Sequence, residues 1–333
     1  MHAENIVVVG ASAGGLAALQ TLLQGFPPNL PAAVLVVVHI SPAHRSNLDS
    51  ILSRAGPLPV AFARHGDKLE AGKVYVAMPD RHLLVARDEA HVVFAPRENR
   101  FRPAIDPLFL SAASTFPGHV TGILLSGGLD DGCKGLFEIE RRGGLTIVQD
   151  PQDAEVPTLP LNALRAVRVD HTLPVRQIAG AVVSALAGSV SVDRLAKKSP
   201  SSPASSSAAK VTFMPHLDGE TRFDGITCPE CHGPIFEASD DPLQFRCIIG
   251  HAYSPGSMRQ EHARRLENAL WSAIAGFEEH ATILRRLTQT TANGAPEEDL
   301  LELEEEARQQ DAHAQELRAF MARIYRAEDK SAA

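Results

Sequence analysis

A serine, a histidine and a pair of aspartates each follow an apolar run that is typical of a buried strand. Ser12 lies in the turn GASAGG, after the run IVVV and before a leucine-rich stretch with helical spacing. His39 follows AVLVVV, and Asp130 and Asp131 come shortly after VTGILL. The carboxyl ends of neighbouring parallel strands meet at one edge of a sheet, so we expect these side chains to converge. Together they would form a nucleophile, a base and a carboxylate that orients the base.

The turn around Ser12 has two chemical interpretations. The spelling G-x-S-x-G between a strand and a helix is that of a nucleophile elbow, but a glycine-rich turn at this place is also typical of a nucleotide-binding loop. A dinucleotide site requires glycine where Ser12 stands and an acidic residue where His39 stands. The sequence therefore favours a serine hydrolase, with the backbone N–H of Ala13 in the oxyanion hole.

Each of these residues also has a purely structural interpretation. Ser12 suits a tight turn, His39 suits a core, and either aspartate suits the N-cap of the helix that follows. Cys133, beside Asp131, is expected to pack at the start of that helix rather than to react.

Three of the four cysteines lie close together near the C-terminal third of the chain. The spacing C-x2-C-x15-C-x3-H is formed by Cys228, Cys231, Cys247 and His251. It resembles a zinc ribbon, and four such ligands fill a tetrahedral shell. We therefore expect a structural zinc and no cofactor for catalysis. His232 and His262 are alternatives to His251 as the fourth ligand.

The elements that must position these residues alternate along the chain. Strands are expected at residues 6–9, 33–38, 60–63, 73–76, 120–125 and 145–148, with a hairpin over 83–94. Helices are expected at 16–23, from the Asp106-Pro107 pair to Thr115, and at 134–142, 160–166 and 175–187. This alternation predicts an α/β fold with a doubly wound, largely parallel sheet and helices on both faces.

Composition divides the chain into four parts. Residues 1–195 form the expected catalytic domain, and residues 196–222 are a linker rich in Ser, Pro and Ala. Residues 223–256 form the zinc-ribbon-like module, and residues 257–328 form a helical hairpin interrupted by Asn-Gly-Ala-Pro. The seam of the hairpin is expected to contain Leu266, Leu270, Ile274, Phe277, Ala281 and Leu284 from the first helix. From the second helix it is expected to contain Leu300, Leu303, Ala307, Ala314, Leu317, Met321 and Ile324.

The overall composition excludes several classes of protein. The chain has 333 residues, of which 44% are hydrophobic and 22% are charged, as in an ordinary globular protein. A net charge of −8 argues against a general nucleic-acid binder. No apolar run approaches the ~20 residues of a membrane span, and no signal peptide is evident. Cysteines that cluster as metal ligands favour a reducing compartment, so we expect a cytoplasmic protein.

Seven motifs together resemble the catalytic domain of CheB-type protein-glutamate methylesterases. In chain order they are GASAGG, VVHIS, MPDRH, FRPAIDPLF, LSGGLDDG, QDP and PLNA. The resemblance implies a triad of Ser12, His39 and Asp131, because alignment of the glycine before the next helix with the family favours Asp131 over Asp130 as the triad carboxylate. It further implies hydrolysis of γ-glutamyl methyl esters on chemotaxis receptors, with release of methanol. Some members also deamidate receptor glutamines.

The chain departs from the family pattern at several places. Ala13 replaces the usual hydroxyl residue after the nucleophile, and Gly128 replaces a methionine that contacts substrate. Arg102 and Asp106 match a family loop near the site, although Asp106 also suits a helix cap. The receiver domain of many members is not expected, because the elbow begins at residue 10, and control by aspartyl phosphorylation in cis is not expected either.

Three classes of function follow, in decreasing order of support. The first is a serine esterase acting on side-chain esters of a methylated chemoreceptor, which is then the protein partner. The second is a non-catalytic signalling scaffold that binds a partner through the C-terminal hairpin. The third is a nucleotide-binding oxidoreductase. In the first case we expect the hairpin to dock on the receptor or on a regulator, and the zinc module to be only weakly coupled to the catalytic core.

Overall fold

The computed structural model describes residues 3–39, 47–188, 223–238, 241–291 and 297–331. The predicted linker, residues 196–222, lies outside the described residues. The chain divides into two compact units, Met1–Met258 and Arg259–Ala333, and each is described by itself.

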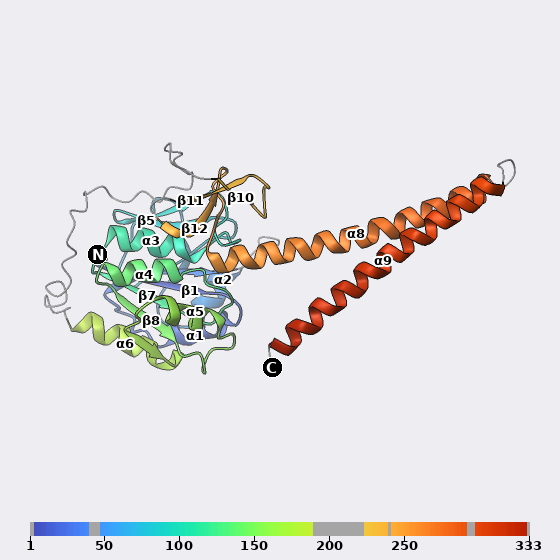
Figure 1. Cartoon of the computed structure of the whole chain (residues 1–333). Helices are drawn as coiled ribbons and strands as arrows, with labels where there is room; N and C mark the ends of the chain where they lie inside the picture. The colour runs from blue at the N-terminus through green and yellow to red at the C-terminus, as the bar shows by residue number, and fades with distance from the viewer. Residues whose placement is uncertain (1–2, 40–46, 189–222, 239–240, 292–296, 332–333) are drawn as a thin grey trace. The chain divides into compact units, whose positions relative to one another are not determined.

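A seven-stranded sheet with the order β3-β4-β2-β1-β7-β8-β9 forms the centre of the first unit (Figure 1). Its strands are β1 (Asn5–Ala11), β2 (Ala32–Val38), β3 (Val60–Phe62), β4 (Val74–Val76), β7 (Val120–Leu124), β8 (Leu145–Gln149) and β9 (His171–Leu173). Every neighbouring pair is parallel. The β-branched strands β1 and β2 are almost wholly buried at the middle of the sheet.

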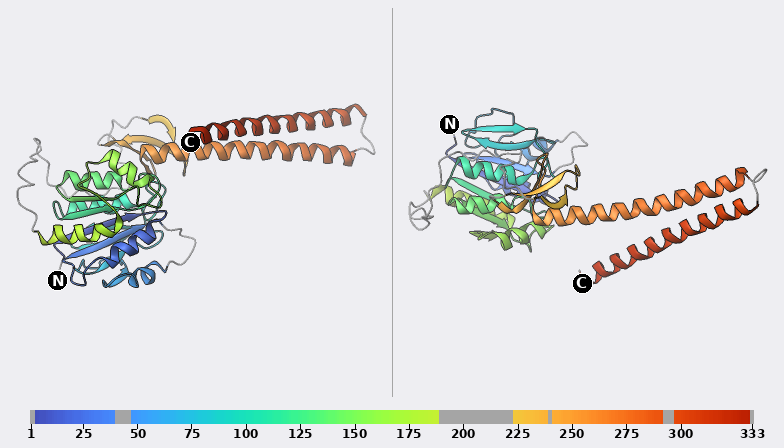
Figure 2. Two further views of the ribbon diagram at one scale, coloured as in Figure 1. Left: turned by 90° about the horizontal axis from the view of Figure 1, so that it is seen from below. Right: turned by 45° about the horizontal axis from the view of Figure 1, so that its top comes forward.

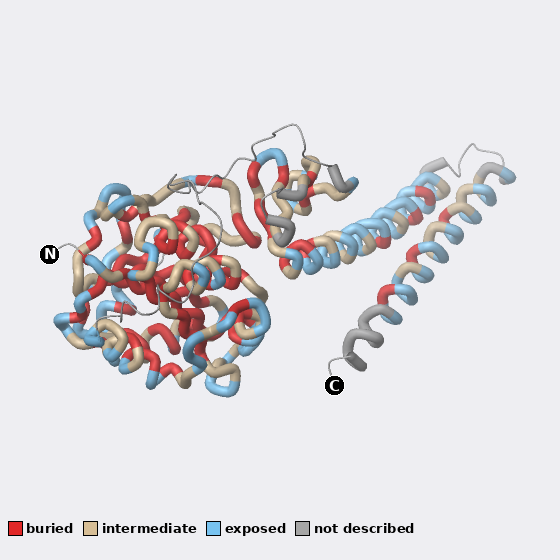
Figure 3. The backbone as a smooth tube through the Cα atoms, turned by 60° about the vertical axis from the view of Figure 1, so that its left-hand side comes forward, coloured by how far each residue is buried: buried red, intermediate tan, exposed pale blue. Residues whose placement is uncertain are grey.

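Helices cover both faces of the sheet, which confirms the predicted doubly wound fold. On one face lie α1 (Gly15–Gln24), α2 (Leu48–Ser53) and α6 (Val175–Ala187). On the other lie α3 (Ile105–Thr115), α4 (Cys133–Arg141) and α5 (Thr158–Ala166), with the hairpin of β5 (His82–Ala86) and β6 (Glu89–Val93). Figure 3 shows the buried residues concentrated in these layers.

The predicted elements differ from the observed ones in four places. The short elements α2 and β9 were not expected, because six and three residues are too few to show a clear period. Helix α3 begins at Ile105 after Ala104, so Asp106 is not its N-cap. The N-cap of α4 is Gly132, so neither Asp130 nor Asp131 has that role.

The cysteine-rich segment forms a separate antiparallel sheet with the order β10-β11-β12-β13. Its strands are β10 (Phe223–Thr227), β11 (Pro234–Ala238), β12 (Asp241–Cys247) and β13 (Ala252–Tyr253). Its core is small and consists mainly of Cys228, Ile235, Cys247, Tyr253 and Met258. A core of this size needs further support, which a metal supplies in many small modules.

Two long helices, α8 (Pro255–Thr291) and α9 (Glu297–Ser331), run in opposite directions as the predicted hairpin (Figure 2). The seam buries Ile274 against Ala314 and Met321, and Ala281 and Leu284 against Ala307. Ion pairs join Glu278 to Arg318 and Arg285 to Asp311. Leu266, expected in the seam, is 61% exposed, and the side chain of Ile324 lies outside the described residues. None of the helices in the described part of the chain has the length and apolar character that a membrane span requires.

Candidate active site

Ser12 lies at the sharp turn between β1 and α1, as the elbow spelling predicts. Its N–H donates to the Ser126 carbonyl at 3.0 Å, and its own carbonyl accepts the Gly15 N–H at 2.9 Å. Gly14 has a φ of 71°, which a residue with a Cβ rarely adopts. Gly127 passes so close that a Cβ there would lie 2.9 Å from the Cβ of Ser12. The turn is therefore fixed on both sides, with Ser12 only half-buried at its apex.

The side chains of Ser12, His39 and Asp131 form one continuous chain of hydrogen bonds. The Ser12 Oγ is 3.1 Å from Nδ1 of His39, and Nε2 of His39 is 2.8 Å from Oδ2 of Asp131. The arrangement follows from the strand order, because β2 and β7 flank β1 and each residue follows the end of its strand. With the Nε2 proton donated to the carboxylate, Nδ1 is free to accept the proton of the serine hydroxyl.

Asp131 is buried and accepts four hydrogen bonds. In addition to Nε2 of His39, the donors are the Ile105 N–H at 2.6 Å, the Asp106 N–H at 3.2 Å and Nδ2 of Asn99 at 2.9 Å. Burial alone raises the pKa of Asp131, but the hydrogen bond and charge of His39, with the Ile105 and Asn99 donors, bring that pKa below its ordinary value. The carboxylate is thus ionised, and it also caps the N-terminus of α3.

The neighbouring aspartates have different surroundings. Asp130 binds the Ser254 hydroxyl and has no hydrogen bond to His39. Asp106 lies in the first turn of α3, where its Oδ1 accepts the Gly135 N–H at 2.8 Å. Burial and the nearby charge of Asp131 raise the pKa of Asp106 well above its ordinary value. Asp106 therefore holds a proton more firmly than Asp131 does.

Three contacts at the site were not expected from the sequence. Phe101 stacks on the ring of His39, with centroids 3.5 Å apart and planes 8° from parallel. Asn99 bridges Asp106 and Asp131 through its Nδ2. The Ser126 hydroxyl donates to the Ala13 carbonyl at 2.8 Å and so holds the turn after the nucleophile. Phe101 is the first residue of the motif FRPAIDPLF, whereas Asn99 lies two residues before the motif and had no signal of its own.

The remaining predicted positions fall around this centre. Ala13 is exposed beside Ser12, and a Cβ built on Gly128 meets no atom within 4 Å. Arg102 lies over the Phe94 ring and pairs with Asp80 at 2.7 Å. Cys133 is buried, and burial raises the pKa of its thiol well above the ordinary value. This agrees with the expected packing role, because an inert thiol is a protonated one.

Comparison with known proteins relates this geometry to a family. Residues 7–182 match the family model described as CheB methylesterase. The chain belongs to the CheB methylesterase family.

Relatives with CheB-type activities in their names match about half of the chain. A protein-glutamate methylesterase/protein-glutamine glutaminase from Anaeromyxobacter dehalogenans is 40% identical over 173 residues, which are 52% of this chain and 51% of that protein. A putative enzyme of the same name from Leptospira interrogans is 34% identical over 174 residues, 52% of this chain and 90% of that protein. The chain thus spans about half the length of the first relative.

A solved structure agrees with the CheB fold. The CheB methylesterase catalytic domain of Thermotoga maritima superposes with a TM-score of 0.52 at 29% sequence identity. The superposition covers 54% of this chain and 97% of that domain. The cysteine-rich sheet and the helical hairpin therefore lie outside the part that matches the CheB family model.

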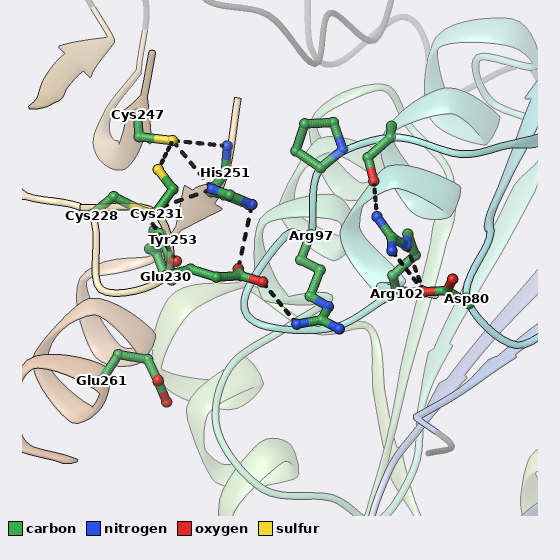
Figure 4. Close-up of polar contacts among 12 residues, drawn as sticks. Asp80, Arg97, Arg102, Cys228, Glu230, Cys231, Cys247, His251, Tyr253 and Glu261 are labelled. Carbon is green, nitrogen blue, oxygen red and sulfur yellow. Dashed lines mark hydrogen bonds and ion pairs between the residues drawn. The ribbon is translucent and has the colours of Figure 1, made fainter. Parts of the chain in front are cut away.

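The predicted metal ligands converge in the part of the chain beyond the CheB match (Figure 4). The ligand atoms of Cys228, Cys231, Cys247 and His251 all lie within 4.8 Å of one another. The Cys231 and Cys247 sulfurs are 3.6 Å apart, and Nδ1 of His251 is 3.4 Å from Cys247 and 3.7 Å from Cys228. A tetrahedral zinc with Zn–S of about 2.3 Å and Zn–N of about 2.0–2.1 Å requires separations of about 3.8 Å and about 3.6 Å. The donor set fits zinc, and it includes neither His232 nor His262.

Proposed function

We propose that this chain is an esterase that hydrolyses γ-glutamyl methyl esters on chemotaxis receptors and releases methanol. The observation that carries the proposal is the continuous chain from the Ser12 hydroxyl through His39 to the ionised Asp131. The names of the relatives from Anaeromyxobacter and Leptospira support both the ester substrate and a second activity, the deamidation of receptor glutamine.

The proposed reaction has two halves. In the first, Nδ1 of His39 takes the hydroxyl proton while the Ser12 Oγ bonds to the ester carbonyl carbon, and the imidazolium is stabilised by Asp131. The tetrahedral intermediate then expels the methoxy group, which leaves as methanol with the proton from His39. In the second half, water gives its proton to His39 and attacks the acyl-serine. The carboxylate of the glutamate departs, and Ser12 regains its proton.

The oxyanion of each tetrahedral intermediate needs donors at the elbow. We assign this role to the N–H of Ala13, which follows the nucleophile and lies in an exposed turn at the start of α1. The Ser126 hydroxyl, bonded to the Ala13 carbonyl, helps to hold this turn in place. In other serine hydrolases one such donor is worth about 3–4 kcal/mol of transition-state stabilisation.

The test is the release of methanol from membranes that contain methylated receptor. Wild-type chain should release methanol at a rate proportional to enzyme concentration, and Ser12→Ala should not. Ser126→Ala, which keeps the nucleophile, should retain a measurable rate. Methylated receptor that loses no methyl groups to folded wild-type chain would refute the proposal and favour the non-catalytic scaffold.

We infer that the cysteine cluster binds one structural zinc. Three thiolates and an imidazole at the observed separations match the geometry of the ion and leave no open coordination position. Glu230 lies 3.5 Å from Nε2 of His251, as an outer carboxylate that orients a ligating histidine does. None of the four cysteines forms a disulfide, which supports a cytoplasmic location.

The helical hairpin is proposed to bring the enzyme to its receptor or to a regulator. It exposes large apolar side chains on both helices, among them Trp271, Ile283, Leu301 and Phe320. Tethering through such a surface raises the local concentration of substrate without changing the chemistry. Hydrolysis of a small ester would not depend on the hairpin.

A further inference from the structure

A single loop, residues 97–101, contacts the catalytic histidine, the catalytic aspartate and the cysteine-rich segment. Phe101 stacks on His39, and Nδ2 of Asn99 donates to Oδ1 of Asp131. On its other side the loop pairs with β13 through a parallel bridge between Glu98 and Ala252. The loop therefore joins two parts of the chain that the sequence predicts to be only weakly coupled.

The side chain of Asn99 is buried, and all four of its hydrogen-bonding positions are used. Its Nδ2 donates to Asp106 at 3.0 Å and to Asp131 at 2.9 Å. Its Oδ1 accepts the Ser254 N–H at 2.9 Å and the Ser257 hydroxyl at 3.1 Å. A backbone N–H can only donate, so Ser254 determines which end of the amide faces Asp131. Ser254 and Ser257 thus select the orientation in which the amide of Asn99 donates a hydrogen bond to Asp131.

The backbone of Asn99 is held by the same segment. The Asn99 N–H donates to the Ala252 carbonyl at 2.8 Å, and the Ala252 N–H donates to the Arg97 carbonyl at 3.3 Å. Asn99 has a φ of 49°, a left-handed conformation that asparagine tolerates better than most residues. A second anchor lies alongside, where the Ser254 hydroxyl is 2.7 Å from both carboxylate oxygens of Asp130.

The metal cluster lies directly before this anchor in the chain. His251 immediately precedes Ala252, and its carbonyl accepts the Cys247 N–H at 2.9 Å. Glu230 lies between Nε2 of His251 at 3.5 Å and the Arg97 guanidinium at 2.8 Å, as Figure 4 shows. An ion bound by the cluster would fix the position of β13, on which the loop depends.

We propose that Asn99 is a positioning residue for Asp131, and that the metal-binding segment, through residues 252–257, holds Asn99 in its working orientation. The inference rests on the proposed function in that Asp131 supports His39 during ester hydrolysis. It corrects the expectation of weak coupling, because the contacts join the zinc module to the hydrogen bonds of the triad. Loss of the metal should then slow the chemical step without altering how substrate binds.

The test compares full-length variants on methylated receptor. Asn99→Ala removes the amide, Ser257→Ala removes one of its donors, and Cys231→Ser removes a metal ligand. Ser272→Ala is the matched control, because its exposed hydroxyl donates only to the backbone of its own helix. Chelation of the metal from wild type gives the same comparison as Cys231→Ser without a substitution.

Four quantities are measured for each protein. They are kcat and KM for the ester, the rate at which a fluorophosphonate labels Ser12, and the hydrogen exchange of a peptide covering residues 97–105. A peptide from β1 serves as the internal reference for exchange. Labelling and exchange need no methyl ester, so they remain informative even if the receptor is not the substrate.

Asn99→Ala should lower kcat ~10- to 100-fold, as the loss of an outer hydrogen-bond partner does, with KM changed less than ~2-fold. Ser257→Ala and metal loss should lower kcat and the labelling rate and accelerate exchange at 97–105. Neither should add to the effect of Asn99→Ala, because all three act through one set of hydrogen bonds. Unchanged labelling and exchange after Ser257→Ala and metal loss would overturn the proposal. The proposal would also be overturned if either change multiplied the loss of kcat caused by Asn99→Ala. If wild type releases no methanol while labelling and exchange respond as expected, only the proposed function fails.

Discussion

Replacing Asp131 by asparagine should nearly abolish ester hydrolysis, whereas the same change at Asp130 should not. Asp131 accepts four hydrogen bonds, two on each oxygen. An asparagine has only one carbonyl oxygen, so its NH2 group must face two donors in either orientation. Each buried donor left without an acceptor costs about 1–3 kcal/mol, so the variant should lose about 2–6 kcal/mol of unfolding free energy.

The kinetic effect of Asp131→Asn should be larger still. A neutral amide cannot balance the charge of the His39 imidazolium, and it favours the wrong tautomer of the ring. The equivalent change in a serine protease lowers kcat about 10⁴-fold, which is about 5.4 kcal/mol of activation free energy. The donors to Asp130 include the Ser254 hydroxyl and the Gly256 N–H, which an amide oxygen also accepts, and none of them is His39. Asp130→Asn should therefore stay within about 5-fold of wild type.

The assay is methanol release from methylated receptor, with the folded fraction of each variant measured by circular dichroism at the assay temperature. His39→Gln provides a second kinetic comparison if Asp131→Asn is too unstable to purify, and it should lose at least about 10³-fold in kcat. Near wild-type turnover in folded Asp131→Asn, together with a severe loss in Asp130→Asn, would show that the wrong aspartate has been assigned.

The C-terminal region and a buried histidine provide three further tests. Purified chain should contain one zinc, and equal zinc in a variant with Cys228, Cys231 and Cys247 all changed to Ser would exclude the site. A chain ending at Arg264 should hydrolyse a small methyl ester as fast as wild type but should hydrolyse methylated receptor more slowly. A chain ending at residue 195 should hydrolyse both substrates slowly, because it lacks the residues that contact Asn99. Burial lowers the pKa of His82 below 6.5. Unfolding free energy should therefore fall as the pH drops below about 6.5, and urea titrations of His82→Phe should show a flatter dependence.

The features that follow from local pattern were predictable from the sequence. Runs of β-branched residues identified the central strands, and the places where those strands end identified Ser12, His39 and the pair Asp130 and Asp131, of which the family resemblance selected Asp131. The spacing of Cys228, Cys231 and Cys247 predicted the cluster that the structure forms, but it left His232 and His262 as alternatives to His251. The sequence could not show where a residue distant in the chain supplies a hydrogen bond that a neighbouring residue was expected to supply. The Asp-Pro pair suggests that Asp106 caps α3, but the Ile105 and Asp106 N–H groups bind Asp131 instead. Asn99 gave no signal, because its role depends on a left-handed backbone and on partners more than 150 residues away.

The charge at the site explains why Asn99 needs such support. Asp106 and Asp131 are both buried, and burial with the charge of Asp131 raises the pKa of Asp106, whereas the pKa of Asp131, which burial alone would raise, is lowered by its hydrogen bond to His39 and by the charge of His39. One charge balances the imidazolium that forms when Ser12 attacks. A second would hold more firmly the proton that His39 must return to the leaving methoxide. The Nδ2 group of Asn99 donates one hydrogen bond to Asp106 and one to Asp131. This orientation of the amide therefore favours an oxygen that can accept a hydrogen bond on each of the two side chains. In the reversed orientation its oxygen would face both carboxyl groups and repel the ionised one. A segment that prevents this reversal therefore protects the charge on which His39 depends.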